Sequence, residues 1–378
     1  RDQPEVVRGA ARCGSPTIVV GVLTKPDAKG RRLRGVLRET WFRLADTRRV
    51  TIRFLLSVPP TTEVPPELQR EATAHGDMLF VPVDPGARKG YSDGKPSNLL
   101  ERVQAFMRWV GRECGDYRYV LKTDDDCYVA IDRLLRRVDA GDFPRSRLYM
   151  GRFLGGMPGR NSEGKPDADN YQNMHEFPKY AGAGYLLTPD VAAFVGAPGL
   201  PMLFHRVEDR GVGVMLNGFN VSYLDGHKEF QPWGQCFESS LWIHHFQKDP
   251  ALMRRRYNRA VAGKSICGAG FPTGVVCAMA EQGKPLKLKC PGGTTVTKVL
   301  FASYGKHLTS APGPCAEGMD ALTTDPTCHY AGSVGLVEKA CVGKSTCDSL
   351  TNTVKALGHD PCPGVHWDKR FIAVVQCA

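Results

Sequence analysis

The sequence predicts an α/β domain with a mostly parallel sheet, followed by a small domain held together by disulfide bonds. Short apolar runs alternate with segments of helical periodicity in the N-terminal part of the 378 residues. Eight of the 13 cysteines lie in the last 102 residues. We therefore divide the chain into a stem or linker (1–16), an α/β domain (17–262), a second linker (263–276) and a cysteine-rich domain (277–378).

The α/β domain opens on a strand–helix–strand pattern. Residues 17–23 (TIVVGVL) form a β-branched run that is typical of a buried strand. Residues 31–44 have helical periodicity, and residues 50–57 (VTIRFLLS) form the next strand, which two prolines end. An apolar run at 79–83 and a helical segment at 98–112 follow. Such alternation favours a parallel sheet with helices packed on it.

A further strand at 117–122 runs into three consecutive aspartates, Asp124, Asp125 and Asp126. Ligands of parallel sheets bind beyond the carboxyl ends of the strands, which is where the triplet falls. Neighbouring carboxylates repel one another, and a divalent cation removes that cost; oxygen ligands favour Mg²⁺ or Mn²⁺. Such a cation can hold a diphosphate leaving group. The alternative is an acidic turn that caps the next helix.

A second acidic feature, Glu208-Asp209, precedes a helix-like segment. A carboxylate here can act as the general base that takes a proton from an attacking hydroxyl. The alternative is that both side chains only favour the N-terminus of the helix. A Gly-, Asn- and Asp-rich stretch at 154–174 predicts a long surface loop.

Four motifs in a fixed order add a family resemblance. They are LRGVLRETW at 33–41, YVLKTDDDCYV at 119–129, YAGAGYLLT at 180–188 and VEDRGVG at 207–213. With these motifs, residues 17–260 resemble the β-1,3-galactosyltransferase family, which includes β-1,3-N-acetylglucosaminyltransferases and Fringe-like enzymes. The resemblance implies a GT-A, Rossmann-like fold, a UDP-sugar donor, Mn²⁺ (or Mg²⁺) as cofactor, and inversion at the anomeric carbon.

The resemblance also implies roles for the acidic residues. Asp126 would coordinate the metal, while Asp124 and Asp125 would contact the ribose or sugar of the donor. Asp209 would be the catalytic base, with Glu208 as its neighbour. Arg210, in the same motif, stands where the family often has Val, a change on the acceptor side.

Two basic groups complete the implied site. Arg34 and Arg38 match the basic helix that lies near the nucleotide in the family; the alternative is a pair of surface arginines at i and i+4. A histidine downstream of the acidic pair completes the metal shell in the family. The segment IHHF offers both His244 and His245 for this position, and the sequence does not choose between them.

The eight C-terminal cysteines form an even set in a Gly- and Pro-rich segment with no CxxC pair, which favours disulfides over zinc. The segments LKLKCPGG, FASYGK, VEKACVGKSTC, DPCPG and KRFIAVVQC resemble the galactose/rhamnose-binding lectin domain of sea urchin eggs. The resemblance covers 277–378 and implies a compact α+β domain. It also implies four disulfides: Cys277–Cys315, Cys290–Cys377, Cys328–Cys362 and Cys341–Cys347.

In such lectins the sugar lies near positions that match Tyr304, Asp360 and Lys369. Lys306 replaces the arginine that is common after the YG pair, and the segment 364–369 departs from the family. Carbohydrate binding and a purely structural module are both left open.

We conclude that the sequence predicts an inverting hexosyltransferase that moves galactose from UDP-galactose to a hydroxyl of a glycan or glycoprotein in a β-1,3 linkage. One rival is transfer from UDP-N-acetylglucosamine: both donors share these motifs, and family frequency with the KTDDD context favours galactose. The other rival is a non-catalytic carbohydrate-binding protein, against which the intact aspartate triplet and acidic pair speak. A glycoside hydrolase is disfavoured, because nothing pairs two carboxylates as that chemistry requires.

Composition bounds the partners and the compartment. The net charge of +11 suits a sugar nucleotide or an acidic glycan, and no nucleic-acid-binding motif accompanies it. Disulfides and the sequon Asn220-Val221-Ser222 predict the secretory pathway, with the Golgi lumen as the site of action. No apolar run of 18 residues occurs, so a type II membrane anchor would lie outside this sequence.

Overall fold

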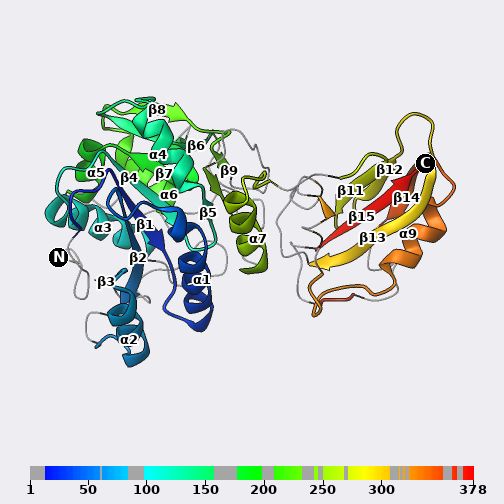
Figure 1. Cartoon of the computed structure of the whole chain (residues 1–378), viewed down its shortest axis with the longest axis horizontal. Coiled ribbons are helices and arrows are strands. Elements are labelled where there is room, and N and C mark those ends of the chain that lie inside the picture. Colours follow the sequence, from blue (N-terminus) through cyan, green and yellow to red (C-terminus); the bar gives the residue numbers. More distant parts are fainter. Residues whose placement is uncertain are drawn as a thin grey trace. The chain divides into compact units, whose positions relative to one another are not determined.

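The computed structural model of the chain describes residues 13–59, 62–83, 98–156, 177–197, 208–231, 242–245, 250–267, 271–306, 315, 318–319, 322, 324–351, 360–363 and 369–378. The chain divides into two compact units (Figure 1). The first comprises Arg1–Pro232 and Ser240–His245, and the second comprises Trp233–Ser239 and Phe246–Ala378. Most of the predicted stem and of the predicted loop at 154–174 lie outside the described residues, and the predicted domain boundaries stay predictions.

The first unit is built on a seven-stranded sheet with the order β3-β2-β1-β4-β7-β6-β8. Its strands are β1 (Ile18–Leu23), β2 (Val50–Val58), β3 (Met78–Pro82), β4 (Tyr119–Asp124), β6 (Leu148–Gly156), β7 (Phe177–Leu187) and β8 (Ser222–Asp225). The first four lie parallel, and β6 lies parallel to β8, while β7 runs antiparallel to both of its neighbours. The predicted α/β fold with a mostly parallel sheet is confirmed.

Helices alternate with these strands. They are α1 (Ala28–Glu39), the 3₁₀ turn η1 (Trp41–Leu44), α2 (Pro66–His75), α3 (Leu99–Glu113), α4 (Ile131–Asp139), α5 (Pro189–Gly196) and α6 (Glu208–Leu216). Local chemistry sets their ends: the Asp27 side chain accepts a hydrogen bond from the N–H of Gly30 and caps α1, and Gly76 ends α2 in the left-handed conformation. A small second sheet joins β5 (Tyr128–Val129), β10 (Ile243–His244) and β9 (Phe230–Gln231).

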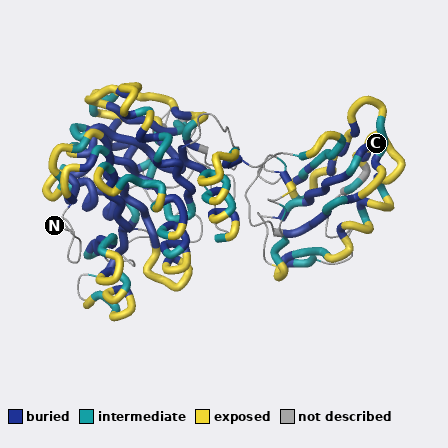
Figure 2. The backbone as a smooth tube through the Cα atoms, in the orientation of Figure 1, coloured by how far each residue is buried: buried dark blue, intermediate teal, exposed yellow. Residues whose placement is uncertain are grey.

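The core of the first unit lies between the sheet and α3. Every residue of β1 is buried, as expected for a strand that is covered on both faces (Figure 2). Helix α3 buries Phe106, and a Cβ added at Gly21 of β1 would lie 2.4 Å from its ring. The absence of a side chain at Gly21 therefore sets how closely the helix approaches the centre of the sheet.

The order of the strands places the aspartate triplet. From β1 the chain proceeds outward through β2 and β3 on one side, and β4 lies on the other side of β1. Leu23 pairs with Asp124 at the carboxyl ends of β1 and β4, and the N–H of Asp125 donates to the carbonyl of Leu23 at 3.0 Å. In open α/β sheets this switch point is where a crevice for a ligand forms.

The second unit contains the cysteine-rich domain. Its elements are α7 (Pro250–Val261), β11 (Val275–Glu281), β12 (Pro285–Lys289), β13 (Val296–Lys306), α9 (Ser333–Cys341), β14 (Thr346–Thr351) and β15 (Lys369–Cys377). One sheet has the order β11-β15-β13, and β12 pairs with β14. All four disulfides that the lectin resemblance implies are present, which confirms a disulfide-rich α+β domain.

The first unit carries a disulfide that the sequence did not predict, between Cys13 and Cys114. Cys267 is disulfide-bonded as well. Among the cysteines that the structure describes, Cys127 is the one without a disulfide, and it is buried. Over the same residues, no helix is long and apolar enough to cross a membrane.

Candidate functional site

Four side chains gather where β4 ends. One ligand atom each from Asp124, Asp126, Cys127 and His245 lies within 4.8 Å of all the others. The imidazole Nε2 of His245 is 3.1 Å from Asp126 Oδ1 and 3.7 Å from Asp124 Oδ2. We call these four residues the metal-competent cluster. Two carboxylates and an imidazole are a donor set that suits Mn²⁺.

The pairing of two short strands brings the histidine to the triplet. In the antiparallel pair of β10 and β5, His244 lies opposite Tyr128, and His245 comes next in the chain. His244 is fully buried and is not part of the cluster. Successive side chains along a strand point to opposite faces, so only one of two adjacent histidines can face the aspartates. The structure therefore favours His245 of the two predicted candidates.

Asp125 occupies a different position from its neighbours. Its Oδ2 accepts a hydrogen bond from Thr24 Oγ1 at 2.6 Å, at the end of β1. Burial raises the pKa of Asp125 to about 7, the charges of Asp126 and Asp124 add to this, and the Thr24 hydrogen bond acts in the opposite direction. Asp125 thus ties the aspartate triplet to the end of β1 through Thr24. Its contact with a donor sugar stays a prediction.

Arg34 and Arg38 of α1 are held by acidic residues. Arg34 is fully buried, and its Nε and Nη2 donate to Glu71 at 2.8 and 2.6 Å. Arg38 donates to Glu71 at 2.7 Å and to both oxygens of Asp77 at 2.8 Å. Burial alone would raise the pKa of Glu71, but the two arginines hold it at about 2. The alternative of surface arginines is wrong for Arg34, while nucleotide contact stays a prediction for both.

The acidic pair begins α6, and Lys122 connects it to the cluster by ion pairs. Buried Glu208 accepts a hydrogen bond from Tyr185 at 2.6 Å and lies 2.8 Å from the Lys122 ammonium. The same ammonium is 3.0 Å from Asp124 Oδ1. Burial alone would lower the pKa of Lys122, but the carboxylates of Asp124 and Glu208 outweigh it and hold the pKa above its ordinary value. One buried cation therefore joins both acidic groups.

Asp209 differs from Glu208 in its surroundings. Its Oδ1 accepts a hydrogen bond from the N–H of Arg210 at 2.8 Å, and Gly182 of β7 lies beside its Oδ2. Burial raises the pKa of Asp209 to about 7, the Glu208 charge adds to this, and Lys122 opposes it. A general base works best with a pKa near the working pH, and the role of Asp209 as a base stays a prediction.

The motif around Gly182 forms a strained turn of β7 beside the cluster. Ala183 has φ +67° and Gly184 has φ +127°, and the pairing of β6 with β7 shifts its register here. The carbonyl of Ala183 accepts from the Cys127 thiol at 3.8 Å. A bulge of this kind re-aims backbone groups next to a site.

This turn supports a first prediction. Gly184→Ala should lower the free energy of unfolding by about 2 kcal/mol or more, because a Cβ there would lie 2.6 Å from the Lys122 carbonyl at a positive φ. Ala183→Gly, the matched control, should stay within about 1 kcal/mol of the wild type, because relief of strain offsets the extra freedom of glycine in the unfolded chain. Urea unfolding compares the two. A Gly184→Ala variant as stable as the wild type would contradict the geometry.

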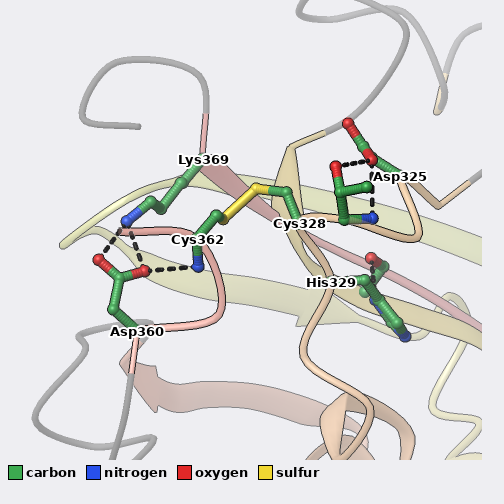
Figure 3. The surroundings of a disulfide bond; sticks show 8 residues. Asp325, Cys328, His329, Asp360, Cys362 and Lys369 are labelled. Carbon is green, nitrogen blue, oxygen red and sulfur yellow. Dashed lines mark hydrogen bonds and ion pairs between the residues drawn. A yellow bond between two sulfur atoms is a disulfide. The ribbon is translucent and has the colours of Figure 1, made fainter. Parts of the chain in front are cut away.

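Two of the three predicted lectin residues, Asp360 and Lys369, lie near the Cys328–Cys362 disulfide (Figure 3). Asp360 lies on one side, with its Oδ1 2.6 Å and its Oδ2 2.5 Å from the ammonium of buried Lys369. Tyr304 is buried, and its ring packs edge-on against Phe371. Of the three predicted residues, only Asp360 is partly exposed. Buried Tyr304 and Lys369 offer a sugar no surface here, so their contact with carbohydrate stays a prediction.

A parallel sheet with acidic, metal-competent residues at its switch point is typical of enzymes that act on phosphorylated ligands. Comparison with protein families gives the class: the galactosyltransferase family model matches residues 32–227, and a model of the D-galactoside/L-rhamnose binding SUEL lectin domain matches residues 288–377. The chain therefore belongs to the galactosyltransferase family and carries a SUEL-type lectin domain at its C-terminal end.

Curated relatives agree with this class. A β-1,3-galactosyltransferase of Arabidopsis thaliana, GALT1, is 29% identical over 224 residues, which is 56% of this chain and 32% of that protein. The human β-1,3-galactosyltransferase 1 is 31% identical over 175 residues, 45% of this chain and 53% of that protein. A UDP-GalNAc:β-1,3-N-acetylgalactosaminyltransferase 2 of Danio rerio is 25% identical over 181 residues, 47% of this chain and 32% of that protein.

The chain thus spans about half of the length of these relatives or less. Among solved structures, the apo structure of the bifunctional glycosyltransferase WbbM is similar with a TM-score of 0.30 and 14% identity, over 56% of this chain and 38% of that chain.

Sequence reasoning missed three residues of this site: Cys127, Lys122 and Tyr185. The first two flank the aspartate triplet in the motif YVLKTDDDCYV, which was the available signal. Tyr185 lies in YAGAGYLLT, where only the hydrogen bond to Glu208 reveals its role.

Proposed function

We propose that this chain is an inverting galactosyltransferase that moves galactose from UDP-galactose to a hydroxyl of a glycan or glycoprotein acceptor and forms a β-1,3 linkage. The observation that carries the proposal is the shared ammonium of Lys122, which holds Asp124 of the metal-competent cluster and Glu208 of the acidic pair in one network. The activities named for the plant and human relatives, both β-1,3-galactosyltransferases, support the donor and the linkage.

The cluster would hold the cofactor of this reaction. Asp126, Asp124 and His245 would bind Mn²⁺, or Mg²⁺, because carboxylate and imidazole donors lie within reach of one cation. When bound, the cation supplies positive charge that stabilises the diphosphate of the departing UDP.

Asp125 would lie on the donor side of the same switch point, where Arg34 Nη1 donates to Thr24 Oγ1 at 3.3 Å. Arg38, which Asp77 holds ahead of β3, would assist the nucleotide side only through the shared partner Glu71.

Asp209 would take the proton of the acceptor hydroxyl as that oxygen attacks the sugar. A sugar hydroxyl is a poor nucleophile at neutral pH, so a carboxylate within hydrogen-bond reach is needed. Glu208 would keep the affinity of Asp209 for a proton high, because its own negative charge raises the neighbour's pKa. Tyr185 and Lys122 hold Glu208 in place and so set the position of the pair.

The cysteine-rich domain would bind carbohydrate, and partly exposed Asp360 is its candidate contact. We further propose that the chain works in the Golgi lumen, because its disulfides require an oxidising compartment. Nucleic acid has no place in this proposal.

A donor screen tests the proposed function. The full chain should hydrolyse or transfer from UDP-galactose with Mn²⁺, and this activity should vanish with a chelator and in Asp126→Asn, because a neutral amide binds a hard cation poorly. UDP-N-acetylglucosamine and UDP-N-acetylgalactosamine are the comparison donors, the latter because of the Danio rerio relative. If only another UDP-sugar is turned over, that sugar and not galactose is what the enzyme transfers. Turnover of none, with carbohydrate binding retained, would favour a non-catalytic carbohydrate-binding protein.

A further inference from the structure

Cys127 stands out because no part of the proposed reaction uses it. It is fully buried, and its sulfur belongs to the metal-competent cluster with Asp124, Asp126 and His245. Its backbone is fixed on both sides: Trp41 Nε1 donates to the Cys127 carbonyl at 3.1 Å, and the Cys127 N–H donates to the Asp124 carbonyl at 3.1 Å. The thiol is therefore held at the cluster by the fold.

The separations in the cluster are compatible with a single cation after modest side-chain movement. Bonds to zinc are about 2.3 Å from sulfur, about 2.0–2.1 Å from imidazole nitrogen and about 2.0–2.2 Å from carboxylate oxygen. At tetrahedral angles, two donors on one such cation thus lie about 3.3–3.7 Å apart. The four donor atoms here are all within 4.8 Å of one another. Closing a tetrahedral shell would therefore require the most distant donors to approach each other by roughly 1 Å.

The chemistry of the donors separates two kinds of cation. Mn²⁺ and Mg²⁺ prefer oxygen and gain little from sulfur, whereas Zn²⁺ and Co²⁺ bind thiolate well. From these observations we infer that Cys127 is a metal ligand specific to thiophilic cations, so that Zn²⁺ or Co²⁺ binds to all four residues in a tetrahedral shell. Binding converts the thiol to a thiolate, and its proton is released to solvent.

A four-residue shell has a consequence for the reaction. Catalytic zinc sites keep an open position for substrate, while sites with four protein ligands are closed. A cation held by all four residues would leave no position for the oxygens of a diphosphate. The same cluster would thus support transfer with Mn²⁺ and block it with Zn²⁺. The difference would come from Cys127, which fills the fourth position only on a thiophilic cation. This step rests on the proposed function, whereas the ligand assignment does not.

The test is titration of the full chain with Co²⁺, without reductant so that the disulfides stay closed. We expect a sulfur-to-cobalt charge-transfer band in the near ultraviolet and the visible bands of tetrahedral cobalt. Cys127→Ser and Cys127→Ala should lose the charge-transfer band and bind Co²⁺ at least about tenfold more weakly. Their Mn²⁺ affinity, measured by calorimetry, should stay within about threefold of the wild type, because the oxygen and nitrogen ligands remain.

Several outcomes would overturn the inference. Cobalt binding without the charge-transfer band, or a band that persists in both variants, would remove Cys127 from the shell. A loss of Mn²⁺ affinity in both variants equal to the loss of Co²⁺ affinity would show a structural role instead. Mn²⁺-dependent transfer that continues alongside any of these results would leave the proposed function standing, so the two failures can be told apart.

Discussion

Asp209→Asn is expected to lower the rate of sugar transfer by roughly 10²–10⁴-fold, the loss typical of removing a general base. The variant should bind Mn²⁺ and UDP with near-normal affinity, because Asp209 is not part of the metal-competent cluster. The amide keeps the shape of the side chain and can still accept from the N–H of Arg210, so the local fold should persist. Only the ability to take a proton is lost.

The measurement pairs UDP titration calorimetry with single-turnover transfer. Asp126→Asn is the matched control, because it should weaken Mn²⁺ and nucleotide binding themselves. If Asp209→Asn loses UDP affinity and a saturating donor restores its rate, Asp209 belongs to the donor site and the base assignment is wrong.

The same residue gives the pH dependence. With a pKa raised to about 7, Asp209 is mostly protonated below that pH and cannot act as a base. Transfer should therefore fall about tenfold for each pH unit below 7 and level off above it. If the residual transfer rate of Asp209→Asn falls in the same way below pH 7, then another group causes that fall.

Lys122→Met is expected to lower the free energy of unfolding of the first unit by about 3–5 kcal/mol at neutral pH. The substitution keeps the apolar length of the side chain and removes the ammonium that lies 3.0 Å from Asp124 and 2.8 Å from Glu208. Buried Glu208 would then lose its ion pair and keep, among the contacts with described residues, the hydrogen bond from the Tyr185 hydroxyl. Urea unfolding, followed by tryptophan fluorescence, measures the loss.

A second substitution separates charge from packing in this experiment. Adding Glu208→Gln to Lys122→Met should recover part of the lost stability, because the neutral amide needs no counter-charge and can still accept from Tyr185. Mn²⁺ should also stabilise Lys122→Met more than the wild type, because a cation at the cluster would replace the lost charge beside Asp124. A loss below about 1 kcal/mol, or a double variant less stable than Lys122→Met, would show that the ammonium is not what holds the network.

The parts of the site that follow one strand were predictable. The triplet was placed at the carboxyl end of a strand because an apolar run leads directly into Asp124. The choice between His244 and His245 was not predictable, because it depends on the pairing of β10 with β5, which lies more than a hundred positions earlier in the chain. Lys122 was read as part of a strand; its partner Asp124 ends that same strand, but its partner Glu208 begins α6, far along the chain.

Burial produced the other differences. The spacing of Arg34 and Arg38 indicated that they share one face of a helix. It could not show that Glu71 and Asp77 pair with them, because both acids come more than thirty positions later in the sequence. The resemblance of the lectin motifs implied all four disulfides, and the structure has them. The motifs could not show that Lys369 turns inward to Asp360, which is a matter of side-chain packing.

The disulfide between Cys13 and Cys114 makes part of the first unit a covalent ring. Its two cysteines are 101 positions apart, and the ring contains β1, β2 and β3 with the helices between them and α3. It closes beside the bridge of Gly14 with Cys114, shortly before β4 begins. A single cut of the backbone inside this ring leaves both pieces attached, so the strand that borders the aspartate triplet stays joined to the strand that carries it.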